Sequence, residues 1–255
     1  MKIVVLCGQG DSSRYFYHAM AGDFEISKVI MEEPVPKSVL IRNRIKRLGL
    51  LTVIDQLLFQ TIVTRVLKFV YAGRLRELKK VYRLNDALIP ENVLISVPSV
   101  NDAATLSILR ELQPDIVIVN GTRIISRKVL RILKNAKVVN THLGITPEYR
   151  GVHGAYWALA NADEEHCGVT VHEVDSGIDT GKIYRQKKIE VDRNKDSFIT
   201  YPLHQYFIGI GLLKEVIADL NSGKSETFSK VSPDSKLYYH PGFTYYIKNF
   251  LKGRK

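Results

Sequence analysis

Asn140 and His142 lie two residues apart at the end of the apolar run Val138–Asn140, and a loop containing Pro147 and Gly151 follows them. Because side chains alternate along a strand, residues two apart point to the same face. The carboxyl ends of parallel strands are where open α/β sheets bind ligands. An amide beside an imidazole supplies a hydrogen-bond donor and a proton carrier. The pair therefore predicts a site at a strand end, whereas a lone histidine would fit a buried structural role.

A second stretch, His172–Gly181, has the pattern of a strand that ends in a loop with two acids, Asp175 and Asp179. By itself this is a common turn composition. Beside the first stretch it supplies a carboxylate, and a carboxylate can hold an imidazole in one orientation. The two stretches together predict a histidine and a carboxylate in one cleft.

The first apolar run, Lys2–Leu6, is followed by a Gly-x-Gly turn. This turn resembles the start of a dinucleotide fingerprint, but Ser13 stands where the third glycine would be. We therefore interpret these residues as a tight strand-to-helix turn that lines a binding site, and we consider a nicotinamide site the less favoured interpretation. The residues of this turn that we assign to substrate contacts are Gly8, Gly10, Asp11 and Ser12.

Elements that position these residues are visible as alternating strand and helix patterns. The strand-like runs, mostly β-branched, are Lys2–Leu6, Ile26–Met31, Ile116–Val119, Val138–Asn140 and Val169–Val174. Helical patterns at 102–112 and 126–133 lie between them, and each starts at a capping residue. This alternation predicts an α/β, Rossmann-like domain with a mostly parallel sheet over residues 1–192. Residues 193–255 form a short C-terminal extension with a helix at about 201–220.

Residues 36–85 interrupt this rhythm and carry most of the net charge. Their apolar positions between Leu57 and Val70 follow a helical period, which predicts a helical insertion. The segment holds twelve Lys and Arg against two acids, so it accounts for ten of the net charge of +11. Such an excess attracts anionic partners, which include a phosphorylated substrate, nucleic acid or an anionic membrane surface. A merely solvated helical face is the alternative.

Bulk composition places the chain among soluble globular proteins: 45% of its 255 residues are hydrophobic and 25% are charged. Cys7 and Cys167 lie far apart in no metal-ligand spacing, so we expect neither a disulfide framework nor a metal site, and a cytoplasmic location. The apolar stretch at 48–71 contains Asp55, Arg65 and Lys68, which argues against a membrane-spanning helix.

Three motifs stand in order along the chain: Asn140-Thr-His142, Pro147-Glu-Tyr-Arg150-Gly151 and Asp175-Ser-Gly-Ile-Asp179-Thr-Gly181. Over about Leu109–Gln186, together with the first strand, the chain resembles the folate-dependent formyltransferase family. The resemblance implies a Rossmann-like formyltransferase domain. It also implies transfer of a formyl group from 10-formyltetrahydrofolate, as co-substrate, to an amine, without a metal. By the same resemblance Asn140, His142 and Asp179 form the catalytic trio.

The resemblance also implies roles. Asn140 would donate a hydrogen bond to the oxyanion that forms when the amine attacks the formyl carbon. His142 would stabilise the intermediate or relay a proton from the attacking ammonium, and Asp179 would orient the imidazole and favour its protonated form. The residues expected around the folate are Thr122, Arg123, Ile125, Ile145, Val174, Asp175 and Gly177. Tyr149 and Arg150 are expected on the acceptor side with the glycine turn.

The family includes enzymes that formylate methionyl-tRNA, glycinamide ribonucleotide and sugar nucleotides. About 70 residues follow Lys187, which is few for a tRNA-gripping barrel with its linker. Asp11 would set a carboxylate against the phosphate of glycinamide ribonucleotide. We therefore expect a small-molecule amine, a nucleotide-linked amino sugar of surface polysaccharide synthesis, and no nucleic acid partner. A hydrolase of the same donor and a non-catalytic protein that binds anionic surfaces are the alternatives, and a homo-oligomer stays open.

Overall fold

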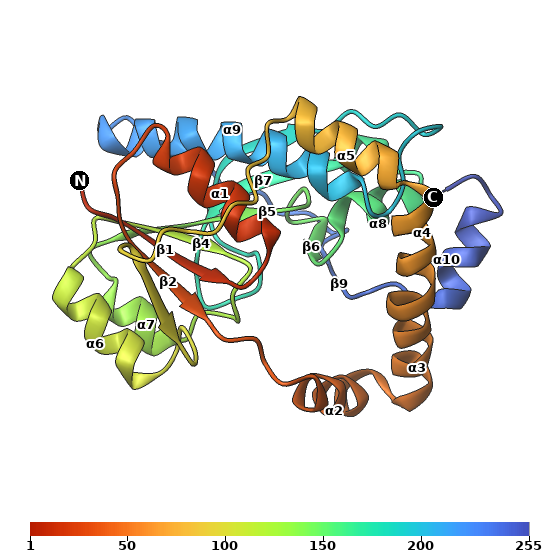
Figure 1. The fold of residues 1–255 in the computed structure, drawn as a ribbon, viewed down its shortest axis with the longest axis horizontal. Coiled ribbons are helices and arrows are strands. Elements are labelled where there is room, and N and C mark those ends of the chain that lie inside the picture. Colours follow the sequence, from red (N-terminus) through yellow and green to blue (C-terminus); the bar gives the residue numbers. More distant parts are fainter. Residues whose placement is uncertain (255) are drawn as a thin grey trace.

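The computed structural model describes residues 1–254 and is built around one seven-stranded sheet in the order β3-β2-β1-β4-β5-β7-β8 (Figure 1). The first five strands pair in parallel, whereas β7 pairs antiparallel with β5 and β8 antiparallel with β7. The predicted mostly parallel α/β sheet is therefore confirmed. The strands are β1 (Ile3–Gly8), β2 (Ile26–Glu32), β3 (Leu94–Val97), β4 (Ile116–Asn120), β5 (Lys137–His142), β7 (Gly168–Glu173) and β8 (Ile183–Lys188).

Helices cover both faces of the sheet, with α1 and α9 along one face and α6 and α7 along the other (Figure 1). Their bounds are α1 (Asp11–Ala21), α6 (Ala103–Leu112), α7 (Arg127–Ile132), α8 (Gly154–Ala160) and α9 (Tyr201–Asn221). The expected caps are present, since Asp102 accepts from the Thr105 N–H and Ser126 from the Val129 N–H. Each cap satisfies a backbone donor that the first turn of a helix leaves unpaired.

Strand β1 shows why the two faces are both apolar. Ile3 and Val5 belong to the core cluster under α1 and α9, whereas Val4 and Leu6 belong to the cluster under α6 and α7. A strand buried on both faces has a continuous run of apolar residues, and this run is the pattern that predicted β1 from the sequence. The chain order reverses between β1 and β4, and the carboxyl ends of strands at such a reversal border a crevice.

The basic segment is helical, as expected. It comprises α2 (Lys37–Leu48), α3 (Leu50–Leu58), a π-helical turn (Phe59–Val63), α4 (Thr64–Val70) and α5 (Ala72–Val81). Figure 1 shows α2 standing apart from the sheet and α3 and α4 forming one continuous column beside α10 (Phe243–Phe250). Within the described residues, Leu50–Val70 is the single helical run long and apolar enough to cross a membrane, by length and composition only.

The C-terminal part adds to the same core. Helix α9 packs its Leu212, Leu213 and Val216 on the sheet. Strand β9 (Lys236–Tyr238) pairs in parallel with β6 (Tyr149–Gly151), and the residues after β9 lead to α10. β9 thus covers the loop that follows His142, and α9 covers the sheet.

Candidate active site

A cavity of about 670 Å³ lies at the carboxyl ends of the central strands and contains the three expected catalytic residues. Asn140 and His142 come from the end of β5, and Asp179 comes from the loop between β7 and β8. Asp179 adopts a left-handed backbone conformation with φ of 52°, which is uncommon for a residue with a Cβ. Its Oδ2 accepts the Gly151 N–H at 2.8 Å, and this bond ties the acid to the loop after β5.

His142 is held from both ring nitrogens. Its Nε2 lies 2.7 Å from the Tyr149 carbonyl oxygen and its Nδ1 lies 3.4 Å from Asp179 Oδ2. Because a carbonyl only accepts, Nε2 carries the proton and Nδ1 is the basic atom of the neutral ring. A Cβ at Gly144 would lie 2.7 Å from Nε2, so only glycine lets the ring reach Tyr149. The ring is therefore preset to accept a proton at Nδ1, beside the carboxylate.

The electrostatics of this pair differ from the sequence expectation. Burial lowers the pKa of His142 and outweighs the opposing attraction of Asp179. Asp179 thus favours the protonated form of His142, as expected, but burial has the larger effect, since only 6% of the His142 side chain is exposed. For Asp179, burial alone would raise the pKa, but His142, His172 and the Gly151 N–H together lower it to about 2. At neutral pH the pair is a neutral imidazole beside a carboxylate.

His172 is a site residue that the sequence analysis did not assign. It lies on β7 directly opposite Asn140, and the two side chains meet with Asn140 Nδ2 at 3.1 Å from His172 Nε2. His172 Nδ1 donates to the Glu173 carbonyl at 2.6 Å, which leaves Nε2 as an acceptor. His172 Nε2 also lies 3.6 Å from Asp179 Oδ1. His172 therefore orients the Asn140 amide and completes a cluster around Asp179.

Most of the residues expected around the folate line this cavity. They come from the loops after β4 and β7 and are Thr122, Arg123, Ile125, Val174, Asp175 and Gly177, joined by the exposed Ile124. Ile145 does not line it, because its side chain is buried under Gly168 of β7. An apolar wall with a few polar groups is typical of small-molecule sites, and a cavity of this volume fits a fused-ring ligand.

The residues assigned to the acceptor are mostly placed elsewhere. Ser12 lines the cavity. Asp11 begins α1 and pairs with Lys79 at 3.4 Å instead. The remaining four are outside the lining for packing reasons: Gly8 lies against Gly121, Gly10 forms the turn before α1, Tyr149 bonds Asp163, and Arg150 reaches the Ile178 carbonyl. Other parts of the chain complete the wall of the cavity.

Those parts are the basic insertion and the C-terminal segment. Arg44 and Arg47 of α2 line the cavity, and Arg44 donates to Gln60 in the π-helical turn at 3.3 Å. The C-terminal segment contributes Pro202, Gln205, Tyr206, Leu237, Tyr238, Tyr239 and His240, and His153 lines the cavity beside His240. Arg44 and Arg47 precede Asn140 by 93 or more residues in the sequence, and the fold brings them into the same cavity as the trio.

His153 and His240 form a buried pair in this wall, with His153 Nε2 2.8 Å from His240 Nδ1. Burial lowers the pKa of His153 to about 3 and that of His240 to about 4. One ring donates to the other, which requires that at least one of them be neutral. The pair therefore connects the start of α8 to the segment that follows β9 in the wall of the cavity.

The free energy of unfolding should fall by on the order of 3 kcal/mol for each of these two histidines as the pH drops from about 6.5 to 4. In that window the unfolded chain binds protons that the folded pair does not, so stability is lost with decreasing pH. His240→Gln should make this dependence shallower in urea unfolding at pH 7, 6 and 5. His18→Gln, a change at the molecular surface, is the matched control. Equal pH slopes for wild type and His240→Gln would refute the assignment.

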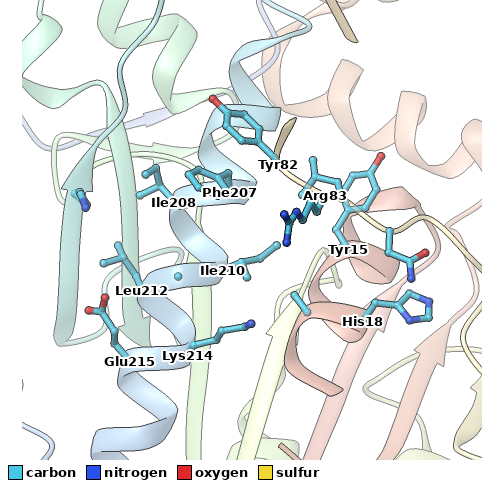
Figure 2. Close-up of a pocket in the computed structure, with 15 residues that line it drawn as sticks. Tyr15, His18, Tyr82, Arg83, Phe207, Ile208, Ile210, Leu212, Lys214 and Glu215 are labelled. Atoms are coloured by element: carbon cyan, nitrogen blue, oxygen red, sulfur yellow. The ribbon is translucent and has the colours of Figure 1, made fainter. Parts of the chain in front are cut away.

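A second cavity, of about 610 Å³, lies between α1 and α9 (Figure 2). Tyr15 and His18 of α1 face Ile210 and Lys214 of α9 across it, and Arg83 lies between them. It contains none of the acid, base and amide groups gathered around Asp179. Among residues 1–254, no group of three or more His, Cys, Asp or Glu is arranged to hold a metal ion.

Comparison with protein families identifies a match between residues 74–201, half of the chain, and the model of the formyl transferase family. This span contains Asn140, His142, His172 and Asp179. Methionyl-tRNA formyltransferase of Finegoldia magna is 31% identical over 164 residues, which cover 62% of this chain and 49% of that protein. The chain thus spans about half the length of the curated relatives it matches.

Solved structures share the fold at low sequence identity. A likely sugar N-formyltransferase of Mycobacterium tuberculosis, Rv3404c, superposes with a TM-score of 0.58 at 14% identity, covering 99% of this chain and 87% of that one. An N-formyltransferase of Helicobacter canadensis, in complex with folinic acid and dTDP-3-aminofucose, has a TM-score of 0.54 at 16% identity, covering 93% and 71% of the two chains.

Proposed function

The chain belongs to the formyl transferase family, and on that premise we propose that it formylates the primary amine of a nucleotide-linked amino sugar with 10-formyltetrahydrofolate as donor. Formation of surface polysaccharide and a cytoplasmic location are part of the proposal. The free thiols of Cys7 and Cys167 fit a reducing compartment. The observation that carries the proposal is the cavity in which the cluster around Asp179 faces two arginines of α2.

The cluster can perform the transfer with the chain's own groups. The amine nitrogen forms a bond to the formyl carbon, the bond from that carbon to N10 of the folate breaks, and a proton passes from the amine to N10. Asn140 uses one amide hydrogen on His172, so the other is free to donate to the oxyanion. His142 takes the proton at Nδ1, where Asp179 stabilises the resulting imidazolium. The folate ring would rest against Ile124, Ile125 and Val174.

Arg44 and Arg47 favour an acceptor with phosphates. Guanidinium groups bind phosphate oxygens through paired hydrogen bonds, and a diphosphate offers several such oxygens. The solved Helicobacter canadensis protein, which shares this fold, was crystallised with a sugar carried on a nucleoside diphosphate. That likeness in fold and the two arginines support an acceptor of the same chemical class here.

Arg44→Gln/Arg47→Gln should raise the KM for a nucleotide-linked amino sugar at least about tenfold, because two charge-assisted contacts are lost. The KM for the folate should change little. Arg42→Gln/Lys46→Gln is the matched control, since these two cations lie on the same helix, are exposed and do not line the cavity. Steady-state kinetics at two salt concentrations measure both effects. Similar KM increases in the two double variants would argue against an acceptor subsite.

A second candidate acceptor is methionyl-tRNA, because the curated relatives that the chain matches are methionyl-tRNA formyltransferases. The test is to incubate the protein with 10-formyltetrahydrofolate and, separately, nucleotide-linked amino sugars, methionyl-tRNA, glycinamide ribonucleotide or buffer alone. Formylated amino sugar identified by mass spectrometry would support the proposal. Formyl-methionyl-tRNA would replace it with the second candidate, and release of formate without an acceptor would indicate a hydrolase.

A further inference from the structure

The helical column α3–α4 has two apolar faces, of which the protein covers one. Val53, Phe59, Val63 and Leu67 are buried, and Phe59 packs edge-on against Phe198 with ring centroids 4.8 Å apart. The other face exposes a stripe at helical spacing: Leu51, Ile54, Leu58, Ile62, Val66 and Phe69. The two ends of this stripe are 82% and 85% exposed. Exposed apolar patches of this length mark an interaction surface.

The column lies on the protein body and is held there by polar contacts. Asp55 accepts the backbone N–H and the hydroxyl of Thr244 at the start of α10. Gln56 donates to the His240 carbonyl at 2.9 Å. A helix that spanned a bilayer would have to give up these bonds and the aromatic packing of Phe59. The exposed stripe can therefore rest on an apolar layer, but the column does not leave the body to cross one.

Positive charge surrounds the stripe. Arg65 lies on the same face, three residues after Ile62 and four before Phe69, and it is exposed. The neighbouring helices α2 and α5 add exposed cations that include Arg42, Lys46, Arg76 and Lys80. The two acids of the segment are already engaged, Asp55 with Thr244 and Glu77 with Arg74. An apolar stripe within a basic surface complements an anionic bilayer.

We propose that the stripe of α3–α4 docks this protein on the surface of an anionic membrane. The apolar side chains enter the boundary between headgroups and acyl chains, while Arg65 and the cations of α2 and α5 meet the lipid phosphates. A second copy of the chain suits this face poorly, because it would bring two segments of like charge together. RNA suits it poorly too, since a row of Leu, Ile and Val offers its phosphates no donors. This inference is independent of the acceptor proposed above.

The test is flotation of the full chain with phosphatidylcholine vesicles that contain or lack about 30% phosphatidylglycerol. Wild type should float only with the anionic vesicles, and high salt should release it. Leu58→Ser/Ile62→Ser, and Phe69→Ser alone, should lower the apparent affinity at least about tenfold. Arg65→Gln should lower it about fivefold. Leu88→Ser/Val231→Ser is the matched control, because it removes two apolar side chains that are exposed outside the stripe.

Thermal melts of the variants establish that they fold. Phe69 is largely exposed, so Phe69→Ser keeps the test valid if Leu58→Ser/Ile62→Ser does not fold. The proposal is overturned if wild type does not bind anionic vesicles, or if the stripe variants and the control bind alike. It is also overturned by a wild-type dimer that the stripe variants dissociate while no vesicle binding is seen. Loss of tRNA binding in those variants, without vesicle binding, would overturn it as well.

Discussion

Replacing Asp179 by Asn should lower kcat by about 10²–10⁴-fold and leave the KM of the folate donor nearly unchanged. The Asp179 carboxylate accepts the Gly151 N–H and lies within 3.6 Å of a nitrogen of both His142 and His172. An amide of the same size cannot stabilise the imidazolium that forms when His142 takes the proton. Because that charge develops only during the reaction, the loss falls on kcat. Stopped-time assays under saturating donor and acceptor measure it.

Asp219→Asn is the control for this substitution, since Asp219 is a partly buried, ion-paired acid far along α9 from the cavity. It should retain full kcat. The pH dependence adds a second readout: wild-type activity should fall as His142 becomes protonated, and its pKa is lowered by burial, so the loss should occur on the acid side. An Asp179→Asn enzyme with wild-type kcat would remove the carboxylate from the mechanism.

The strands that the sequence predicted are those buried on both faces. β1 and β4 are runs of Val, Ile and Leu because helices cover both sides of them. The two edge strands were missed for the opposite reason. β3 has only four residues and is interrupted by the exposed Ser96, and β8 ends in the exposed pair Lys187 and Lys188. The three-residue strands β6 and β9 exist only because the fold brings them together.

The site shows the same division between local and tertiary information. Asn140 and His142 were visible because strand alternation is local. His172 was not, since its contact with Asn140 depends on the antiparallel register of β7 beside β5. Arg44 lines the cavity because of the course that the insertion takes in the fold, and no local sequence pattern specifies that course. The effect of Asp179 on the His142 pKa could be expected from residue types, whereas the larger effect of burial depends on the tertiary structure.

Asn140→Ala should lower kcat by about 100- to 1000-fold, the typical loss when one oxyanion donor is removed. Asn140 Nδ2 is held by His172 Nε2 at 3.1 Å, so the amide is oriented before the substrate arrives and its second hydrogen stays available for the oxyanion. Alanine removes this donor without disturbing the backbone of β5. Single-turnover rates with prebound donor isolate the chemical step, and Asn221→Ala at the exposed end of α9 is the control.

The double variant Asn140→Ala/His142→Ala decides whether the two residues act as a unit. If His142 removes the proton from the same tetrahedral species that Asn140 stabilises, the double variant should be little slower than the slower single variant. Independent roles would instead multiply the two losses. His172→Phe should lower kcat less than Asn140→Ala, because it misorients the amide but does not remove it. A double variant whose loss equals the product of the single losses would contradict a shared intermediate.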